Sequence, residues 1–221
     1  MIRLNDINKA YKNGELSNEV LHDVTLEIPD AKVVSITGPS GAGKSTLLNL
    51  MALLDVPTSG SIYFNDQLVS EENAETRAAF RLKRFGFVFQ DYQLISTMNA
   101  RDNIVFPAHY KGDTFEELYF QQIVSACQLN NLLEHFPHEL SGGEQQRVAV
   151  CRALCSKPDV IFADEPTGNL DSKNAETVFN LLIESVRLNQ GTLIYVTHEA
   201  RFAELADMRI LVNDGVCQWQ T

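Results

Sequence analysis

The sequence predicts an α/β protein with a mostly parallel sheet, an N-terminal antiparallel β-subdomain and an inserted α-helical subdomain. Three observations support this fold class. Short apolar runs end in polar residues, the N-terminal region alternates apolar and polar residues, and a stretch with helical periodicity interrupts the apolar runs. Continuous apolar runs are typical of strands buried on both faces, whereas alternation is typical of strands with one solvated face.

The antiparallel strands are predicted from alternation and from turn residues. Ile2 to Ile7 and Val24 to Ile28 alternate, and Ser61 to Phe64 precedes an Asn65-Asp66 turn. Near the C-terminal end, Arg209 to Trp219 holds a central Asn-Asp-Gly between two apolar runs, which is a strong hairpin signal.

The parallel sheet is predicted from four apolar runs that each lead into residues able to bind a ligand. These runs are Val33 to Thr37 before Gly38, Phe85 to Phe89 before Gln90, Val160 to Ala163 before Asp164 and Glu165, and Leu193 to Thr197 before His198. Ligands bind just beyond the carboxyl ends of strands in such sheets. The sequence therefore predicts a phosphate site at this edge.

A helical subdomain is predicted between Gln90 and Leu140. Thr114 to Leu133 carries apolar residues mostly at helical spacing. We expect residues 1–221 to form a single domain. The core and the antiparallel subdomain are expected in about residues 1–90 and 157–221, and the helical subdomain in about residues 91–156.

The composition narrows the class of protein. The formal net charge of −11 argues against a nucleic-acid binder, which needs a basic face. No apolar run approaches the roughly 20 residues of a membrane span, and the first residues lack the apolar core of a secretory signal. Four cysteines are few for a disulfide framework in a chain this long. We expect a cytoplasmic chain that would reach a membrane only through a partner.

A phosphate-binding loop is predicted between the first apolar run and the apolar segment Leu47 to Leu54. The loop matches G-x-x-x-x-G-K-[ST] with Gly38, Pro39, Ser40, Gly41, Ala42, Gly43, Lys44, Ser45 and Thr46. Its N–H groups and the following helix N-terminus can cradle phosphate, Lys44 can reach the β- and γ-phosphates, and Ser45 can ligate Mg²⁺. A chance match is the alternative, but the strand–loop–helix context favours a P-loop NTPase core.

Two adjacent acids follow the third apolar run. Asp164 is predicted to hold Mg²⁺, and Glu165 to orient and deprotonate the water that attacks the γ-phosphate. The alternative is a pair of helix-capping acids. Adjacent carboxylates are poorly tolerated without a nearby cation, which favours the metal-binding interpretation.

The octapeptide LSGGEQQR, Leu140 to Arg147, precedes a predicted helix from Glu144 to Ser156. Ser141 to Glu144 fits a capping box, so an ordinary capped helix is one interpretation. Gly142 and Gly143 are poor helix formers, however, and lie where bare N–H groups could receive an anion.

This octapeptide resembles the signature motif of ATP-binding-cassette (ABC) ATPases. The chain resembles this family along essentially its whole length. The resemblance implies that ATP and Mg²⁺ are the ligands. It also implies a head-to-tail dimer with a second copy, in which Ser141, Gly142 and Gly143 contact the γ-phosphate held by the opposite subunit. Integral membrane permease subunits are the other implied partner.

Four further residues resemble family elements. Gln90 resembles the glutamine that senses Mg²⁺ and couples to the permease, and His198 resembles the switch histidine at the γ-phosphate. Asp171, in Asn169-Leu170-Asp171, resembles the D-loop acid, and Tyr11 resembles the aromatic that stacks on adenine. A structural histidine and a packing tyrosine are the alternatives for His198 and Tyr11. Lys44, Gln90, Glu165 and His198 are the predicted catalytic residues.

Three segments resemble the subfamily that serves lipoprotein release, macrolide or peptide export, and the cell-division ABC complex. They are LDVPTSG at Leu54 to Gly60, GFVFQ ending at Gln90, and DEPTGNLDS at Asp164 to Ser172. Three residues depart from the family without removing a catalytic group: Leu53 for Gly, Asp102 for Glu and Glu199 for Asp.

The resemblance implies an ATP-hydrolysing subunit that powers a membrane ABC transporter, peripheral to the inner face of the cell membrane through its permease. Export or extraction of a lipoprotein, peptide or drug-like substrate is the first hypothesis. The alternative is the ATPase of a non-transporting mechanotransmission complex, as in cell division. A soluble ABC ATPase of translation or DNA repair is disfavoured, because those chains usually carry two cassettes or a long coiled coil.

Overall fold

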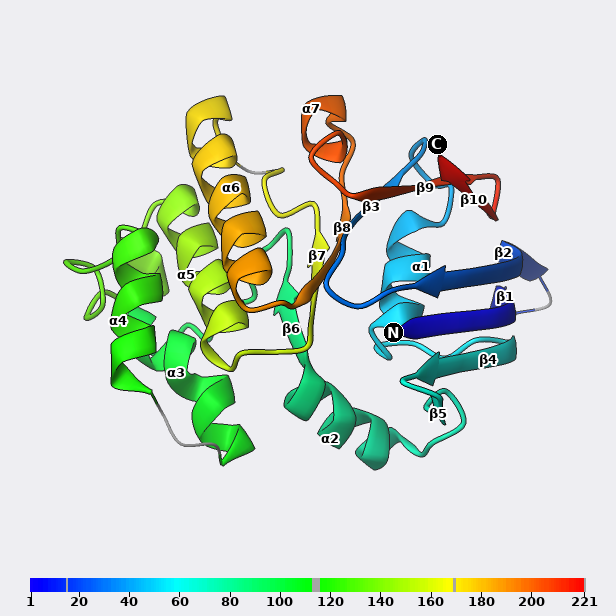
Figure 1. The fold of residues 1–221 in the computed structure, drawn as a ribbon, viewed down its shortest axis with the longest axis horizontal. Helices are drawn as coiled ribbons and strands as arrows, with labels where there is room; N and C mark the ends of the chain where they lie inside the picture. Colours follow the sequence, from blue (N-terminus) through cyan, green and yellow to red (C-terminus); the bar gives the residue numbers. More distant parts are fainter. Residues whose placement is uncertain (15, 113–115, 169, 221) are drawn as a thin grey trace. The chain divides into compact units, whose positions relative to one another are not determined.

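The computed structural model describes residues 1–14, 16–112, 116–168 and 170–220 (Figure 1). The chain divides into two compact units, Met1–Arg81 with Ile194–Thr221, and Leu82–Leu193. In the described part of the chain, no helix has both the length and the apolar character that crossing a bilayer requires.

The first unit contains a four-stranded antiparallel sheet with the strand order β2-β1-β4-β5. Its strands are β1 (Ile2–Asn13), β2 (Leu16–Ile28), β4 (Ser59–Phe64) and β5 (Gln67–Leu68). Ile2 and Leu4 are buried as alternation requires, and an irregularity between Leu4 and Ile7, where Asp6 has a φ of 50°, brings Ile7 into the core as well. The predicted turn is confirmed, since Asn65 and Asp66 both have positive φ, as a tight hairpin requires.

The first unit also contains neighbouring strands in the order β10-β9-β3-β8, with the phosphate-loop helix and a short helix after β8. These elements are β3 (Val33–Thr37), α1 (Lys44–Met51), β8 (Thr192–Val196), α7 (Ala200–Ala203), β9 (Met208–Asn213) and β10 (Val216–Gln220). Strand β3 pairs with β9 in parallel, and β9 pairs with β10 in antiparallel register. The predicted parallel strand Val33 to Thr37 and the predicted C-terminal hairpin are therefore both confirmed.

Buried hydrogen bonds fix the segment that carries His198 between β8 and α7. The Tyr195 hydroxyl, fully buried on β8, donates to the Phe202 carbonyl over 2.6 Å. Ser35 on β3 donates to the Ala203 carbonyl over 3.3 Å. Burial raises the pKa of Tyr195, so its hydroxyl stays a donor at neutral pH.

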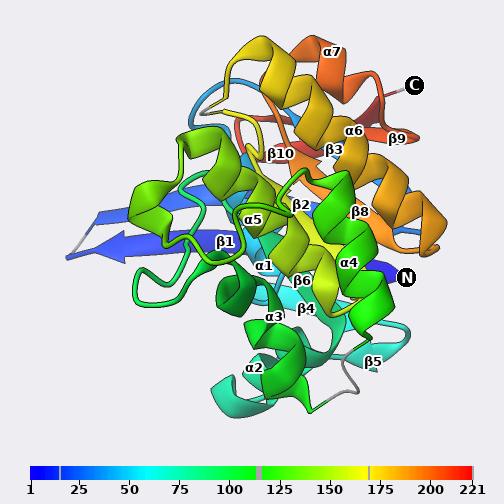
Figure 2. The ribbon, with the colours of Figure 1, turned by 90° about the vertical axis from the view of Figure 1, so that its left-hand side faces the viewer.

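The second unit is built around the helix that follows the octapeptide. Its elements are β6 (Phe85–Val88), α3 (Ala100–Lys111), α4 (Glu117–Ala126), the 3₁₀ turn η1 (Pro137–Glu139), α5 (Gly142–Cys155), β7 (Val160–Asp164) and α6 (Ser172–Leu188). Helix α2 (Ala74–Arg84) leads into β6. Helix α5 contacts α3, α4, α6 and β6, and Figure 1 shows α4, α5 and α6 side by side. Figure 2 presents the same helices from the side.

The stretch Thr114 to Leu133, whose apolar spacing indicates the helical subdomain, is only partly helical. Helix α4 ends at Ala126, and Gln128 has a φ of 56°, which reverses the backbone. Leu129 is fully buried although it lies outside the helix, so its apolar spacing reflects packing after the turn. The start at Thr114 and Phe115 lies outside the described residues.

Helix α3 was not predicted, although its ends carry recognisable signals. The Asn99 side chain accepts a hydrogen bond from the Asp102 N–H over 2.8 Å, and Gly112 ends the helix with a φ of 77°. Pro107 lies inside the helix and obscures the pattern, because proline normally interrupts helices.

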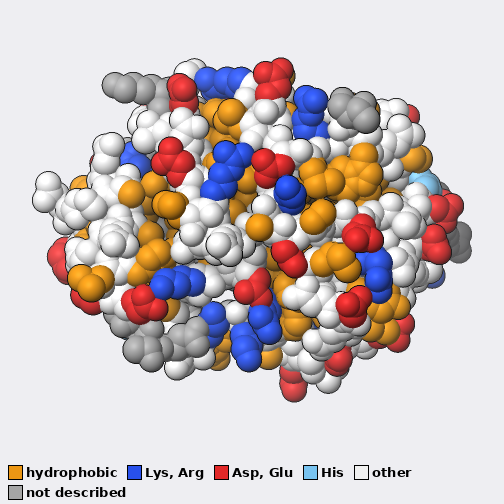
Figure 3. Space-filling model, viewed as in Figure 1, with side chains coloured by type: hydrophobic (Ala, Val, Ile, Leu, Met, Phe, Trp, Pro, Cys, Tyr) orange, Lys and Arg blue, Asp and Glu red, His pale blue; other side chains and the backbone are white. Residues whose placement is uncertain are grey.

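Charged side chains of both signs share the face drawn in Figure 3, where acidic and basic groups alternate with hydrophobic ones. Ion pairs also form at the surface of the second unit, for example Arg84 with Asp159 over 2.7 Å and Arg101 with Glu117 over 3.3 Å. Exposed pairs of this kind stabilise a fold by at most about 1 kcal/mol each.

Replacing Tyr195 by Phe should lower the free energy of unfolding by about 1–2 kcal/mol, because the buried Phe202 carbonyl loses its donor. Urea denaturation measures the change. Tyr110→Phe is the control: Tyr110 is 72% exposed, and its substitution should change the free energy by less than about 0.5 kcal/mol. Equal stability of the two variants would contradict the proposed anchoring by Tyr195.

Candidate functional site

The phosphate loop takes a path that only glycine permits at its first residue. The chain leaves β3 at Gly38, whose φ is 143°. A Cβ at this position would lie 2.0 Å from the Val212 carbonyl oxygen, well inside the contact distance. Gly41 and Gly43 also have positive φ, 79° and 104°, so the loop turns back on itself before α1 begins.

The N-terminus of α1 faces this loop without a capping side chain. Gly43 is the N-cap residue and has no side chain to receive the first N–H groups. The Lys44 ammonium donates to the loop's own carbonyls, over 3.0 Å to Gly38 and 2.8 Å to Pro39. Free helix N–H groups beside a cation are the chemistry that binds phosphate.

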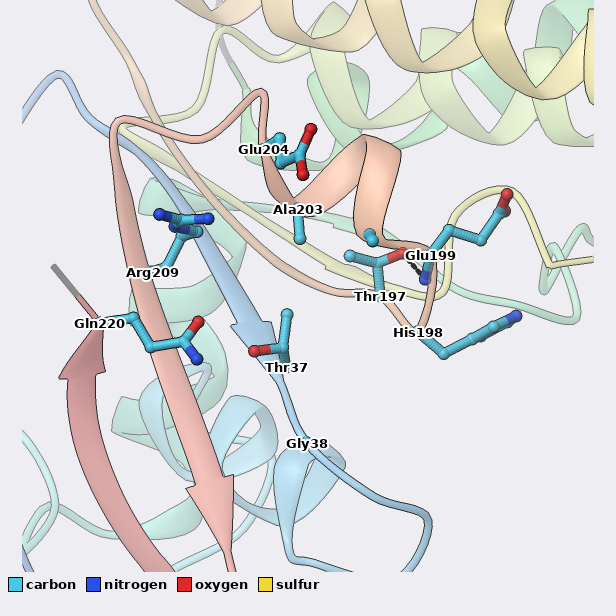
Figure 4. A pocket seen from close by; sticks show the side chains of 10 residues that line it. Thr37, Gly38, Thr197, His198, Glu199, Ala203, Glu204, Arg209 and Gln220 are labelled. Atoms are coloured by element: carbon cyan, nitrogen blue, oxygen red, sulfur yellow. Dashed lines mark hydrogen bonds between the residues drawn. The ribbon is translucent and has the colours of Figure 1, made fainter.

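His198 lines a cavity of about 280 Å³ that also includes Thr37 and Gly38 (Figure 4). The Glu199 N–H donates to the Thr197 hydroxyl over 3.1 Å, which fixes the turn that presents the histidine. Glu199, one of the departures from the family pattern, forms an ion pair with Arg201 over 2.7 Å. The phosphate loop and His198 thus share one wall of the first unit.

Tyr11 is 43% exposed and lies on β1 with its hydroxyl bonded to Asp55. Asp55 follows the end of α1, the helix that begins in the phosphate loop. An aromatic ring held beside this helix is well suited to receive a nucleotide base.

In the second unit, Gln90 and Glu165 converge on Gly168. A Cβ at Gly168 would lie 3.4 Å from Gln90 Nε2 and 3.4 Å from Glu165 Oε2. The parallel pairing of β6 with β7, Val88 opposite Ala163, explains why the residues after both strands meet. Glu165 has a φ of 45°, an uncommon conformation for a residue other than glycine that recurs at functional sites.

The octapeptide forms the capping box that its sequence predicts. Ser141 caps α5 and accepts from the Glu144 N–H, while Glu144 Oε2 accepts from the Ser141 N–H over 2.8 Å and from its hydroxyl over 2.7 Å. These hydrogen bonds from Ser141 are the main cause of a lowered pKa of Glu144. Gly142 leaves room for the Tyr92 hydroxyl, 2.8 Å from where its Cβ would be.

Asp171 serves as a helix cap in the structure. Its two carboxylate oxygens accept from the Asn174 N–H over 3.0 Å and the Asn174 side chain over 2.6 Å, at the start of α6. A Cβ on Gly143 would lie within 3.8 Å of Leu170 and Asn174, so this cap lies next to the octapeptide. Asn169 lies outside the described residues.

Arg152 fixes the segment after Gln90, and the sequence analysis missed it. Its guanidinium donates to the carbonyls of Gln93 over 2.5 Å and Tyr92 over 2.6 Å, and burial lowers its pKa to about 10. Asn103, fully buried, bonds Ile95 through both side-chain atoms. Residues 92–95 are therefore held by α3 and α5.

Comparison with known proteins identifies the family. The ABC transporter family model matches residues 21–168. The macrolide export ATP-binding/permease protein MacB of Brucella melitensis is 45% identical over 97% of this chain, which spans 33% of that protein's length. The lipoprotein-releasing system ATP-binding protein LolD of Psychrobacter arcticus is 41% identical, covering 97% of this chain and 96% of that protein.

A solved structure agrees with this match. The dimeric ATP-binding cassette MJ0796, in a post-hydrolysis state bound to ADP and Pi, superposes with a TM-score of 0.92. It is 34% identical and covers 100% of this chain and 98% of its own. The chain belongs to the ABC transporter family. Its class of enzyme is that of the ABC ATPases, and the α/β fold with parallel and antiparallel sheets is confirmed.

For this ABC chain, the structure brings the predicted site residues together within each unit. The phosphate loop, Tyr11 and His198 belong to the first unit, and Gln90, Asp164, Glu165, Asp171 and the octapeptide belong to the second. Their roles as ligands of ATP and Mg²⁺ stay predictions. Cys151 and Cys155 lie on α5 and are buried.

The phosphate loop supplies a matched pair of variants. Gly38→Ala should lower the free energy of unfolding by at least about 3 kcal/mol, because a methyl group must displace the Val212 carbonyl. At Gly41 nothing lies within 4 Å of the Cβ position, so Gly41→Ala should cost only about 1–2 kcal/mol of backbone strain. Thermal and urea unfolding measure both changes. Equal losses would show that the Val212 contact does not constrain the loop.

The capping box predicts a pH dependence. The folded pKa of Glu144 is lowered, so its contribution to stability is present above its unfolded pKa and is lost as pH falls through the folded pKa. Glu144→Gln should therefore be less stable than the parent by about 0.5–1 kcal/mol at pH 7, with the difference vanishing in acid. Parallel melting curves from pH 7 down to about pH 3.5 test this. A difference that does not change with pH would rule out the carboxylate charge as the source.

Proposed function

We propose that this chain is the ATP-hydrolysing subunit of a membrane ABC transporter that exports or extracts a lipoprotein, peptide or drug-like substrate. The observation that carries the proposal is Glu165, a carboxylate in a strained conformation after a buried strand, beside Gln90 and Gly168. Such a carboxylate can accept a proton from an attacking water. The names of relatives in macrolide export and lipoprotein release support the class of substrate.

In this proposal the phosphate loop binds the triphosphate. Backbone N–H groups of the loop and of the first turn of α1 donate to phosphate oxygens, and Lys44 exchanges its bonds with the Gly38 and Pro39 carbonyls for the β- and γ-phosphates. His198 supplies a further donor to the γ-phosphate. Tyr11 stacks on the adenine base, with Asp171 completing the contacts of the bound nucleotide.

The proposed metal ligands fit Mg²⁺ by their chemistry. Ser45 offers a hydroxyl, Gln90 an amide oxygen and Asp164 a carboxylate, and Mg²⁺ prefers such oxygen donors, usually with few protein ligands. When bound, Mg²⁺ neutralises charge on the β- and γ-phosphates. Asp164 is half-buried at the end of β7, so its carboxylate can serve a ligand that reaches the strand end.

Two copies and a permease complete the proposed assembly. Ser141, Gly142 and Gly143 of one copy donate to the γ-phosphate bound by the other, as the dimeric state of MJ0796 suggests. We propose that a membrane permease is the other partner of this chain, in line with the names of relatives in macrolide export and lipoprotein release. The chain would then lie at the inner face of the cell membrane through that partner.

Glu165→Gln tests the proposed chemistry. The amide cannot take the proton from water, so the rate of ATP hydrolysis should fall by about 10²–10⁴-fold while ATP affinity is kept. ATP should also shift the variant to a dimer in size-exclusion chromatography, because the nucleotide is not consumed. Phosphate release and isothermal titration calorimetry give the two measurements.

Glu71→Gln is the control, since it removes an exposed carboxylate at the same change in net charge. It should hydrolyse ATP at the parental rate. Unchanged hydrolysis by Glu165→Gln would overturn the assignment of Glu165 as the base. Loss of ATP binding in that variant would show that the side chain acts in binding instead.

A further inference from the structure

Tyr11 lies in a hydrogen-bonded cluster with Lys9 and Asp55, two side chains that the proposed function does not use. The Tyr11 hydroxyl donates to Asp55 Oδ2 over 2.7 Å, and the Lys9 ammonium donates to Asp55 Oδ1 over 2.7 Å. Lys9 also donates to the Val56 carbonyl over 2.7 Å. Its ammonium lies 4.6 Å from the centroid of the Tyr11 ring, within range of a cation–π contact.

The local structure explains why these residues meet. Lys9 and Tyr11 are two residues apart on β1, so their side chains project to the same side of the strand. Asp55 follows the end of α1, the helix that begins in the phosphate loop. The cluster therefore connects β1 to the residues that follow α1.

The charges in the cluster are well compensated. Lys9 is only 7% exposed and would be costly to bury without a partner. Burial alone raises the pKa of Asp55, but hydrogen bonds from Lys9, Tyr11 and the Val56 N–H outweigh it and lower that pKa. Asp55 is consequently ionised at neutral pH and holds both neighbours.

We propose that Lys9 and Asp55 are positioning residues for the nucleotide base: they fix the Tyr11 ring at a set distance from the phosphate loop. This inference rests on the proposed stacking of the base on Tyr11. Lys9 covers one face of the ring, so the base stacks on the other. A ring held before the ligand arrives loses little conformational freedom on binding, which raises affinity for the nucleotide as a whole.

The inference predicts a loss that depends on the base. Without its anchors the Tyr11 side chain must be ordered during binding, which weakens ATP affinity by about 3- to 10-fold. Inorganic tripolyphosphate has no base, so its affinity stays unchanged. In hydrolysis the KM for ATP rises while kcat is kept, because Lys9 and Asp55 contact no reacting atom.

The variants are Asp55→Asn, Lys9→Met, Tyr11→Phe and the double variant Lys9→Met/Asp55→Asn. The double variant removes both charges together, which avoids a buried unpaired ammonium and protects the fold. Calorimetric titration of purified protein with ATP and with tripolyphosphate, each with Mg²⁺, gives the affinities. Tyr11→Phe combined with Asp55→Asn should be no weaker than the worse single variant, since both break the same bond.

Asp66→Asn is the matched control. It removes an acidic group of the same unit, 78% exposed and paired only loosely with Arg3 over 3.5 Å. Its affinity for both ligands should equal that of the parent. Equal weakening of ATP and tripolyphosphate in the Asp55 and Lys9 variants would overturn the inference, because the cluster would then act on the phosphate loop.

Tyr11→Ala separates this inference from the proposed function. If Tyr11→Ala leaves ATP affinity unchanged, stacking on Tyr11 is wrong and the inference falls with it. If Tyr11→Ala weakens ATP but the double variant does not, stacking stands and the positioning role of Lys9 and Asp55 is overturned. Weakening in both, with tripolyphosphate unaffected, is the result we expect.

Discussion

The carbonyl of Val212 leaves no space for a side chain at Gly38, and the whole phosphate loop depends on this contact. The parallel pairing of β3 with β9 places Leu211 opposite Thr37, so the next residues of both strands must meet. The β9–β10 hairpin, with Val212 opposite Cys217, holds that carbonyl in place. A C-terminal element far from the motif in sequence thus shapes the loop, and the loop in turn sets where α1 begins.

The octapeptide Leu140 to Arg147 has two structural roles. Ser141 and Glu144 satisfy the exposed N–H groups at the start of α5, as any good helix cap does. Gly142 makes room for Tyr92, while Arg152 near the other end of α5 holds the carbonyls of Tyr92 and Gln93. Helix α5 therefore contacts the segment after Gln90 at two points, Gly142 and Arg152. We expect a displacement of the helix to move that segment with it.

The sequence was sufficient for the features that depend on local rules. Glycine spacing predicted the phosphate loop, apolar runs predicted β3, β6, β7 and β8, and the Asn-Asp-Gly turn predicted the C-terminal hairpin. Each of these is determined by residues within a few positions of one another. The same approach failed where packing decided the outcome. The apolar spacing of Thr114 to Leu133 did not reveal where α4 ends, and Pro107 concealed α3.

The candidate site shows the same difference between residues that belong to a local motif and residues that act through a distant contact. Residues within a motif, such as Lys44 and Glu165, could be selected from spacing alone. Lys9 and Arg152 could not, because each acts on a residue far away in the chain and neither belongs to a motif. Asp55 lies in the segment LDVPTSG, but that segment did not reveal its contact with Lys9. The Lys9–Asp55 pair spans 46 positions, a separation at which single-sequence patterns carry no information.

Two strained residues show how the fold tolerates an unfavourable backbone, and for different reasons. Leu53 has a φ of 55° where the family commonly has glycine. Its side chain is buried, and burying leucine contributes about 1.5–3 kcal/mol, more than the 1–2 kcal/mol that the conformation costs. Glu165 has a φ of 45°, but its half-buried carboxylate gains no such apolar burial. Backbone strain that packing does not offset is expected at positions where the chemistry of a site requires a particular side chain. This difference favours Glu165 over its unstrained neighbour Asp164 as the residue that activates water.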